Sequence, residues 1–366
     1  MDILNINTAE HGGRTDDDNG GMNMIDFSAN VSPFGTPDGV RQALENAARD
    51  AHIYPDPSCR RLRGAISDAY GIPAEWILCG NGASDLIWRI ALASSRKSFY
   101  RGRAALIVAP TFSEYENALK ACGRVNIKRY NLNLDADFYI RSDFLNWITG
   151  DVDLIFLCQP NNPTGMPVRM DLARRILNRC RETGTRLIWD ECFLDFMDSP
   201  ENYTLLDALS SEPNLIILRA FTKFYGMAGA RLGYAFCSDE DYLNNLIGPP
   251  WSVSRLAQEA GIAALRDLNY TRNLRDYISR ERSRLYRGLK LLNFRVIPGT
   301  ANFLLFQSPV YLDQFLYQKG IFIRNCGNFK NLNAFWYRIA VRTEQENNRL
   351  LDALREAVGT LAENRI

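Results

Sequence analysis

Residues in the middle of the chain could together handle a cofactor that carries an aldehyde, a pyridine ring and a phosphate. Lys223 lies in RAFTKFYGMAGARLGY (219–234), where glycines allow close backbone approach and Arg231 adds positive charge. A desolvated lysine beside a cation has a lowered pKa and can form an imine. Asp190 ends the run RLIWD (186–190), and a buried carboxylate facing a pyridine nitrogen would keep that nitrogen protonated. These residues predict a pyridoxal 5′-phosphate (PLP) site.

Two further positions could contact the ring of such a cofactor. Asn162 lies in PNNPTG (160–165), where an asparagine either serves a turn alone or donates its amide to the phenolic oxygen. Phe112 follows a strand-like run, and its ring could stack on the cofactor or pack in the core. The sequence leaves both choices open, and we assign both residues to the cofactor.

The segment GNGASD (80–85) has the composition of an anion site. It follows the strand-like WILC (76–79) and opens a helix, and backbone N–H groups at a helix N-terminus bind anions. Position 85 is Asp, so the segment only partly matches a dinucleotide fingerprint. We assign to the cofactor, chiefly to its phosphate, Gly82, Ala83, Ser84, Thr222 and Arg231.

Composition excludes several classes of function. The 366 residues carry a formal net charge of +1, which gives no broad basic field for nucleic acid or an anionic membrane. The eight cysteines are spread singly without CxxC spacing, so no metal site is predicted and a reducing cytoplasm is expected. The first residues contain no apolar signal region, and no run reaches the length of a membrane span.

Unbroken apolar runs alternate with helical segments between about residues 60 and 245. Unbroken runs suit strands that are buried on both faces of a mainly parallel sheet. The expected strands are 76–79, 105–109, 153–158, 186–190, 214–218 and 232–237, with helices at 114–122 and 169–184. This order predicts an α/β protein whose large domain has three layers, α/β/α.

The pattern changes at PPWSVSRL (249–256). A helical stretch of about 254–292 follows, with strands expected at 294–297, 302–306, 321–324 and 335–341. We therefore predict three parts: residues 1–50, an N-terminal arm and a helix (38–50) that docks on the small domain; residues 51–248, the large PLP-binding domain; and residues 249–366, a smaller α+β domain.

From about residue 10 to its end, the chain resembles the fold-type I PLP enzymes of the class I/II aminotransferase family. Two branches compete: the histidinol-phosphate aminotransferases, and the L-threonine-O-3-phosphate decarboxylases that make aminopropanol phosphate for the cobalamin nucleotide loop. Phe193 favours the decarboxylases, because the aminotransferases usually have there a Tyr that hydrogen-bonds the cofactor. Segments similar to the decarboxylases are HGG (11–13), DFSANVSPFG (26–35), FSEY (112–115), TKFY (222–225), PWSV (250–253), IRNCGNF (323–329) and YRIAVR (337–342).

The resemblance implies roles for residues outside the PLP motifs. Arginine suits bidentate recognition of carboxylate and phosphate, and three arginines lie in or near strands of the small domain. By resemblance, Arg338 holds the substrate α-carboxylate, and Arg324 with Arg342 meets the substrate phosphate. By the same resemblance, Asn30 and His11 line the entrance, and Tyr54 reaches the PLP phosphate of a neighbouring subunit, which implies a homodimer with shared sites.

The expected reaction is decarboxylation of L-threonine O-3-phosphate, or of L-serine O-phosphate. An aminotransferase that uses 2-oxoglutarate has the same parts and stays open, as does a non-catalytic protein of this fold. Ala220 stands where the family usually has Ser or Thr on the cofactor phosphate, at a cost of about 1 kcal/mol for one lost hydrogen bond. Ala220 also leaves open the alternative that the substrate is another amino acid with a phosphate, phosphonate or sulfonate group.

Overall fold

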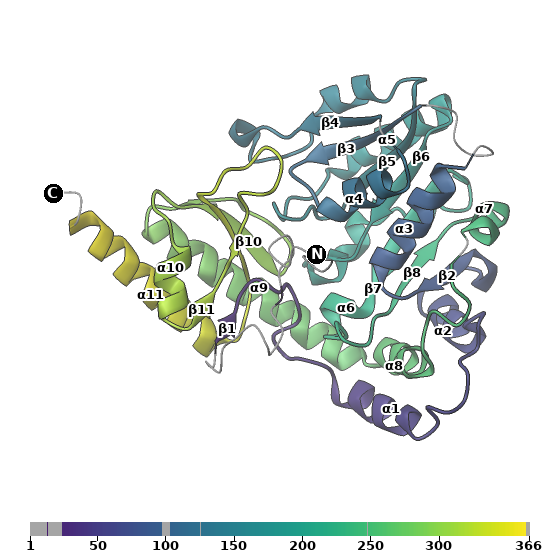
Figure 1. Cartoon of the computed structure of the whole chain (residues 1–366), viewed down its shortest axis with the longest axis horizontal. Coiled ribbons are helices and arrows are strands. Elements are labelled where there is room, and N and C mark those ends of the chain that lie inside the picture. The colour runs from purple at the N-terminus through teal and green to yellow at the C-terminus, as the bar shows by residue number, and fades with distance from the viewer. Residues whose placement is uncertain (1–12, 14–23, 97–102, 125, 247, 364–366) are drawn as a thin grey trace, which may run out of the picture.

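The computed structural model describes residues 13, 24–96, 103–124, 126–246 and 248–363. A seven-stranded sheet forms the centre of the large domain, in the order β2-β8-β7-β6-β5-β3-β4 (Figure 1). Neighbouring strands are parallel except around β8, which is antiparallel to both β2 and β7. The strands are β2 (Ile77–Gly80), β3 (Ala104–Ala109), β4 (Ile127–Asn131), β5 (Val152–Cys158), β6 (Arg186–Asp190), β7 (Leu215–Ala220) and β8 (Gly233–Phe236).

Helices cover both faces of this sheet, so the predicted three-layer α/β/α architecture is confirmed. In β5, Leu154 and Phe156 face a core shared with α3 and α4, whereas Ile155 and Leu157 face a core shared with α2, α5 and α8 (Arg255–Arg266). This alternation explains the unbroken apolar runs, because both sides of each strand are buried. The helices are α2 (Arg60–Tyr70), α3 (Ala83–Ser94), α4 (Ser113–Ala121), α5 (Met170–Thr183), α6 (Phe221–Phe224) and α7 (Glu240–Asn245).

The small domain is built on a four-stranded antiparallel sheet in the order β12-β13-β10-β9, with a parallel pair β1–β11 beside it. Side chains of α9, α10 and α11 share one core with this sheet. The strands are β1 (Ile25–Asp26), β9 (Arg295–Val296), β10 (Phe303–Gln307), β11 (Ile321–Phe322), β12 (Arg324–Asn325) and β13 (Trp336–Ala340). The helices are α9 (Leu268–Leu291), α10 (Asp313–Gln318) and α11 (Glu344–Glu363).

The structure differs from the expected elements in several places. β1 was not expected, and the strand expected over 321–324 is divided between β11 and β12, which belong to different sheets. β4 was not expected, because its sequence IKRYN is mainly polar. The strand can be polar because it is the last strand of the sheet and pairs with only one neighbour, β3. The helical stretch expected over 254–292 is divided into α8 (Arg255–Arg266) and α9. Asp267 causes the break, because its side chain accepts a hydrogen bond from the N–H of Tyr270 at 2.9 Å and caps the second helix.

The N-terminal helix α1 (Asp38–Ala48) packs on α8. Val40 of α1 and Ala257 and Ala260 of α8 belong to the core on one face of the large sheet, so this helix pair lies against the large domain (Figure 1). The three domain ranges given above stay a prediction. Among the described residues, no helix combines the length and the apolar composition that crossing a membrane requires.

Candidate active site

A cavity of about 420 Å³ lies where the carboxyl ends of the large sheet face the small domain. β5, β6 and β7 are parallel and end at this edge, and β2 ends there too because it is antiparallel to β8, which is antiparallel to β7. Ligands of open α/β sheets bind at such an edge. The predicted residues that line the cavity are Asn30, Ala83, Ser84, Phe112, Asn162, Asp190, Thr222, Lys223, Arg231, Arg324 and Arg338.

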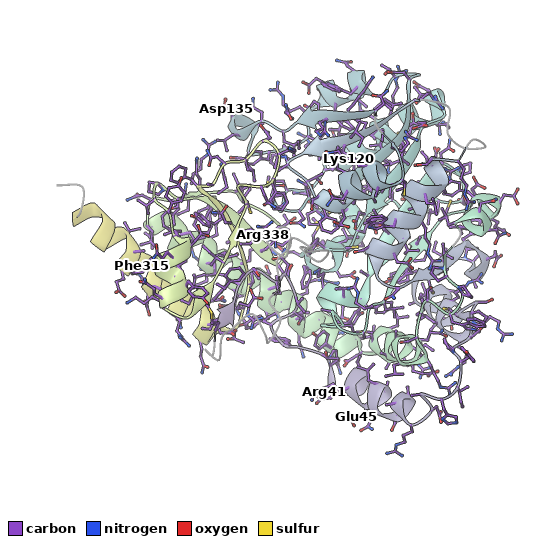
Figure 2. All side chains as sticks on the ribbon, in the orientation of Figure 1. Arg41, Glu45, Lys120, Asp135, Phe315 and Arg338 are labelled. Atoms are coloured by element: carbon purple, nitrogen blue, oxygen red, sulfur yellow. The ribbon has the colours of Figure 1, made fainter. Side chains whose placement is uncertain are left out.

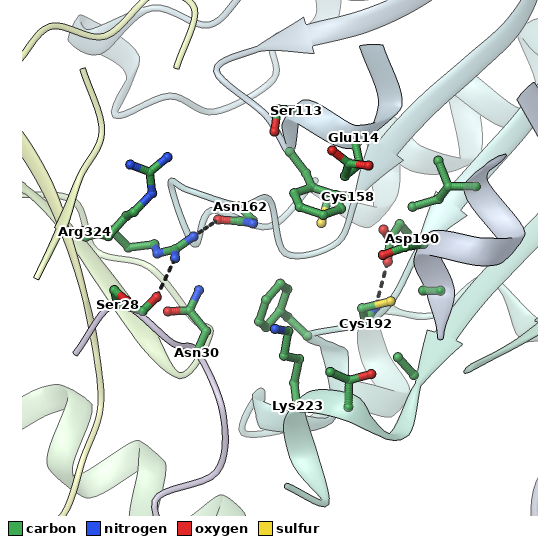
Figure 3. A pocket seen from close by; sticks show the side chains of 18 of the residues that line it. Ser28, Asn30, Ser113, Glu114, Cys158, Asn162, Asp190, Cys192, Lys223 and Arg324 are labelled. Carbon is green, nitrogen blue, oxygen red and sulfur yellow. Dashed lines mark hydrogen bonds between the residues drawn. The ribbon is translucent and has the colours of Figure 1, made fainter. Parts of the chain in front are cut away.

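Lys223 lies in α6, directly after β7, and its side chain points into the cavity (Figure 3). Burial, with smaller contributions from the positive charges of Arg338 and Arg231, lowers the pKa of Lys223 to about 8. An amine with this pKa is far more often unprotonated at neutral pH than an ordinary lysine, so it can attack an aldehyde.

The lowered pKa of Lys223 predicts how cofactor uptake depends on pH. In cofactor-free protein, we expect the rate of covalent PLP incorporation to rise about tenfold for each pH unit below pH 8 and to level off above it, because only the free amine reacts. The measurement is the absorbance change on mixing with PLP between pH 6 and 10. Nα-acetyl-lysine, measured in parallel, corrects for the titration of PLP itself. A rate that still climbs steeply near pH 10 would contradict the lowered pKa.

Asp190 ends β6 at the opposite side of the cavity from Asn30 and Arg324 (Figure 3). The O–H of Tyr115 donates to Oδ2 of Asp190 at 2.6 Å, and the N–H of Cys192 donates to Oδ1 at 3.0 Å. Burial raises the pKa of the Asp190 carboxyl, and these hydrogen bonds oppose the rise. A pyridinium nitrogen opposite the carboxylate would supply the positive charge that favours its ionised form.

Removing the Tyr115 hydroxyl tests whether its hydrogen bond stabilises the ionised form of Asp190. We expect Tyr115→Phe to weaken PLP binding about tenfold, because one hydrogen bond to a charged group is lost and the pKa of Asp190 rises. As the pH is lowered, the PLP affinity of Tyr115→Phe should therefore begin to fall at a higher pH than the PLP affinity of the unchanged protein. PLP dissociation constants from fluorescence titration between pH 5 and 8 provide the measurement.

Tyr130→Phe is the matched control for this test, because the Tyr130 hydroxyl also donates to a carboxylate, that of Asp143, at 2.7 Å, outside the cavity. Its PLP affinity should not change. Equal PLP affinity of Tyr115→Phe and the unchanged protein at every pH would show that Tyr115 does not support Asp190.

The start of α3 and Arg231 form a cradle for an anion. Gly82 caps α3 with a φ of +81° and without a side-chain hydrogen bond, and the first N–H groups of a helix have no partner within it. A Cβ on Gly82 would lie 2.6 Å from Nη2 of Arg231, so only glycine lets the guanidinium reach this position. Likewise, a Cβ on Gly233 would lie 2.5 Å from the backbone N of Ala83, so glycine here keeps β8 close to the helix start.

Arg338 lies between the two domains (Figure 2), and its side chain meets three segments. It donates to Oδ1 of Asn162 and, through Nη2, to the backbone O of Ser28 at 2.8 Å. When the Asn30 side-chain amide is oriented with its oxygen toward Arg338, this oxygen accepts hydrogen bonds from Nη1 and Nε of Arg338, both at 3.2 Å. Burial lowers the pKa of Arg338 to about 10, so it stays positively charged at neutral pH. Because Asn162 accepts through its oxygen, its NH₂ group is free to serve another acceptor.

Arg324 and Arg338 are direct partners on neighbouring antiparallel strands, β12 and β13. Residues opposite each other in such a pair project from the same face of the sheet. Arg324 donates to Oδ1 of Asn328 at 2.8 Å and to the backbone O of Asn325, and its guanidinium lies 5.5 Å from the ring of Phe329. The two buried guanidinium groups therefore give this side of the cavity its positive charge.

Two described residues that were predicted for the site, Arg342 and Tyr54, do not line this cavity. Arg342 follows the end of β13, and its Nη2 pairs with Glu346 at 2.9 Å, so this arrangement does not support a contact with a substrate phosphate. Tyr54 is 76% exposed and packs on the ring of Trp251 at 4.9 Å. His11 lies outside the described residues. Gly82 does not line the cavity itself but forms the base of the cradle described above.

Sequence reasoning missed several lining residues, chiefly Ser28, Ser113, Glu114, Cys158, Cys192 and Phe329. It also missed Tyr115, although the signal was present: residues three apart on a helix share a face, and Phe112 was already assigned to the site. Cys192 had a weaker signal, because an Asp commonly accepts a hydrogen bond from the N–H two residues later.

The donor set fits PLP: an amine of lowered pKa, a buried carboxylate, an asparagine amide and an anion cradle surround one cavity. Residues 22–354 match the family model described as aminotransferase class I and II. The chain therefore belongs to the class I and II aminotransferase family, and its cofactor is PLP.

The relatives fall into both expected branches. The chain is 36% identical to a threonine-phosphate decarboxylase from Salmonella typhimurium over 93% of its own length and 92% of that protein. It is 30% identical to a histidinol-phosphate aminotransferase from Methanothermobacter thermautotrophicus, with 92% and 89% covered. The crystal structure of the histidinol-phosphate aminotransferase from Clostridium acetobutylicum superposes with a TM-score of 0.84 at 27% identity, covering 91% of this chain and 99% of that one.

Proposed function

We propose that the protein catalyses PLP-dependent decarboxylation of L-threonine O-3-phosphate, or of L-serine O-phosphate, to an amino-alcohol phosphate for the cobalamin nucleotide loop. The observation that carries this proposal is the pairing of Arg324 with Arg338 beside Lys223. Similarity to a threonine-phosphate decarboxylase over nearly the whole chain supports it.

The spacing of the two arginines suits a short substrate with two anionic ends. Directly opposite residues of antiparallel strands have Cβ atoms about 4.5–5.5 Å apart. In threonine phosphate the carboxylate is on Cα and the phosphate ester is on the adjacent carbon, so two neighbouring guanidinium groups can each bind one end. Histidinol phosphate has no carboxylate and would leave one of these buried cations without an anionic partner.

The side chains can then be given roles. Bound PLP supplies an aldehyde that links to the substrate amine and a ring that accepts the electrons released at Cα. Arg338 would bind the α-carboxylate and Arg324 the phosphate, and the two contacts together would fix the orientation of the substrate at Cα. Asp190 holds the proton on the ring nitrogen. After loss of CO₂, the ammonium form of Lys223, or a water beside it, would give a proton to Cα and leave the lysine as the free amine.

Amine transfer from histidinol phosphate to 2-oxoglutarate is the second candidate. It is favoured by the similarity to histidinol-phosphate aminotransferases in both sequence and structure. The two arginines would then serve the two carboxylates of 2-oxoglutarate in its half-reaction. Against it stands Phe193, which lines the cavity with a ring that packs on Phe303 at 5.1 Å and has no hydroxyl to offer the cofactor.

Product analysis separates the two candidates. We expect the PLP-loaded protein, given O-phospho-L-threonine without a keto acid, to release CO₂ and aminopropanol phosphate over many turnovers. A parallel reaction contains histidinol phosphate and 2-oxoglutarate, and we expect no glutamate from it. Glutamate formation without CO₂ release in the first reaction would assign the protein to the aminotransferases and overturn the proposal. Comparing the rates with threonine phosphate and serine phosphate then measures the preference for the methyl group.

A homodimer with shared sites is part of the proposal. The exposed rings of Tyr54 and Trp251 support it, because stacked aromatic groups at a surface suit a protein contact. Full activity of a monomer in analytical ultracentrifugation would contradict it. We also propose a cytoplasmic location, since the eight cysteines are all free and suit a reducing compartment.

A further inference from the structure

A second cavity of about 220 Å³ lies beside the first one. Its walls are α4, the end of β3, Arg129 of β4 and residues 328–330 of the small domain. Three residues, Phe112, Ser113 and Phe329, line both cavities, so the two spaces are direct neighbours.

The charged residues of the second cavity are mainly positive. Lys120, Arg129 and Lys330 face one carboxylate, that of Glu116, which leaves an excess of two positive charges. Glu116 accepts from Nε of Arg129 at 2.8 Å and from Nη2 at 2.6 Å, and Lys120 contacts it at 2.5 Å. Arg129 and Lys120 lower the pKa of Glu116 to about 2. Glu116 is therefore ionised at neutral pH, and the excess of two positive charges is present there.

The two lysines are the cations best placed to bind a ligand, although Lys120 shares the Glu116 carboxylate with Arg129. Arg129 is held by both oxygens of Glu116, whereas Lys120 projects from α4 (Figure 2) with more than half of its side chain exposed. Lys330 makes no ion pair with any residue that the structure describes. Two ammonium groups at the walls of one small polar cavity attract an anion of high charge density.

The second cavity is also connected to the substrate arginine. Asn328 lines the second cavity, and its Oδ1 accepts the hydrogen bond from Arg324, which lines the first. The ring of Phe329 lies against the Arg324 guanidinium and borders both spaces. A ligand that contacts Asn328 or Phe329 in the second cavity would therefore be one side chain away from Arg324.

We propose that this second cavity is a binding site for a phosphate group, separate from the PLP phosphate cradle and from Arg324. Lys120 and Lys330 bind the oxyanion, and Asn117 and Asn328 complete the polar wall. The group comes either from inorganic phosphate or from a phosphomonoester, and in the second case the site holds phosphorylated ligand beside the reaction cavity. The site does not depend on which reaction the enzyme catalyses.

Calorimetric titration of the PLP-loaded enzyme with inorganic phosphate at constant ionic strength tests the site. We expect Lys120→Gln combined with Lys330→Gln to weaken phosphate binding about 100-fold, or about tenfold for each charge-assisted hydrogen bond that the substitutions remove. Lys128→Gln combined with Lys319→Gln is the matched control, because these lysines pair with Asp151 and Glu356 elsewhere on the surface. The control pair should bind phosphate as the unchanged enzyme does.

Arg324→Gln decides which cavity the phosphate occupies. Binding that survives in Arg324→Gln supports the second cavity. Binding that is abolished there, unchanged affinity in the Lys120 and Lys330 variant, or no phosphate binding by the unchanged enzyme overturns the proposal. O-Phosphoethanolamine replaces inorganic phosphate in a second titration. If O-phosphoethanolamine binding is weakened by the Lys120 and Lys330 substitutions as phosphate binding is, the result supports a site for phosphomonoesters. If the enzyme binds inorganic phosphate but not O-phosphoethanolamine, the proposal of a phosphomonoester ligand is overturned.

Discussion

Lys223→Ala will reduce turnover by at least ~10³-fold, the loss expected when a proton-transferring group is removed. The reason lies in the cavity: burial and two nearby arginines lower the pKa of Lys223 to about 8, and among the described residues no other lysine lines the site. The variant should still bind PLP through the cradle of Gly82 and Arg231, but without a covalent bond. Borohydride reduction followed by mass spectrometry of peptides should label Lys223 in the unchanged protein and no residue in the variant.

Lys290→Ala is the control for this variant, because Lys290 is an exposed lysine of the same charge on α9, outside the cavity. Its activity and labelling should match those of the unchanged protein. Residual turnover above about one per cent in Lys223→Ala, or borohydride labelling at another lysine, would show that a different amine serves the cofactor.

Asp190→Asn should lower turnover by about 10²–10³-fold while keeping the shape of the side chain. The carboxylate is buried at the end of β6 and held by Tyr115 and Cys192, so it is oriented before any ligand arrives. An amide cannot stabilise a proton on the ring nitrogen, and the ring then accepts electrons from Cα less well. PLP affinity should fall as well, because an attraction between opposite charges in a poorly hydrated site is lost.

Steady-state kinetics at saturating PLP separate the two effects of Asp190→Asn. A lowered kcat that added PLP does not restore is the expected result. Full recovery with excess PLP would mean that Asp190 only helps to bind the cofactor. Asp135→Asn, a change on an exposed acid of the β4–β5 connection, should alter neither quantity and controls for the loss of one charge.

Much of the large domain could be predicted because its signals are local. Each predicted apolar run of four to six residues formed a strand, and Gly184 ends α5 in the left-handed conformation expected of a C-terminal glycine. Asp190, the last residue of β6, and Lys223, which follows β7, line one cavity because both strands end at the same edge of the sheet. Topology then brings such residues together without further information from their side chains.

The adjacent acids Asp190 and Glu191 show what local sequence patterns cannot predict. Asp190 and Glu191 are both buried at the end of β6, but Glu191 pairs with Arg219 at 2.7 Å and Asp190 faces the cavity. Side chains of consecutive strand residues point to opposite faces, so the two acids must differ in surroundings. Which face holds the ligand depends on what packs there, and that depends on residues far away in the chain.

The small domain shows the same limit for the arginines. Arg338 was predicted to bind the substrate carboxylate and Arg324 with Arg342 the substrate phosphate, yet only Arg324 and Arg338 line the cavity. Their proximity depends on the register of β12 against β13 and on β1, which brings Ser28 and Asn30 to Arg338. Strand register and pairing between segments far apart in the chain are set by tertiary packing, and a single sequence contains no local signal for them.

The sequence by itself determined the class of cofactor and the alternation of strands and helices along the large domain, and it singled out Lys223 and Asp190 as the candidates to serve that cofactor. These follow from residue type and from short-range periodicity, which one chain displays in full. Only the tertiary structure decided that two arginines stand side by side, that Tyr115 supports Asp190, and that a second basic cavity lies next to the first. Those features depend on distant segments coming together, and their geometry arises when the domains pack.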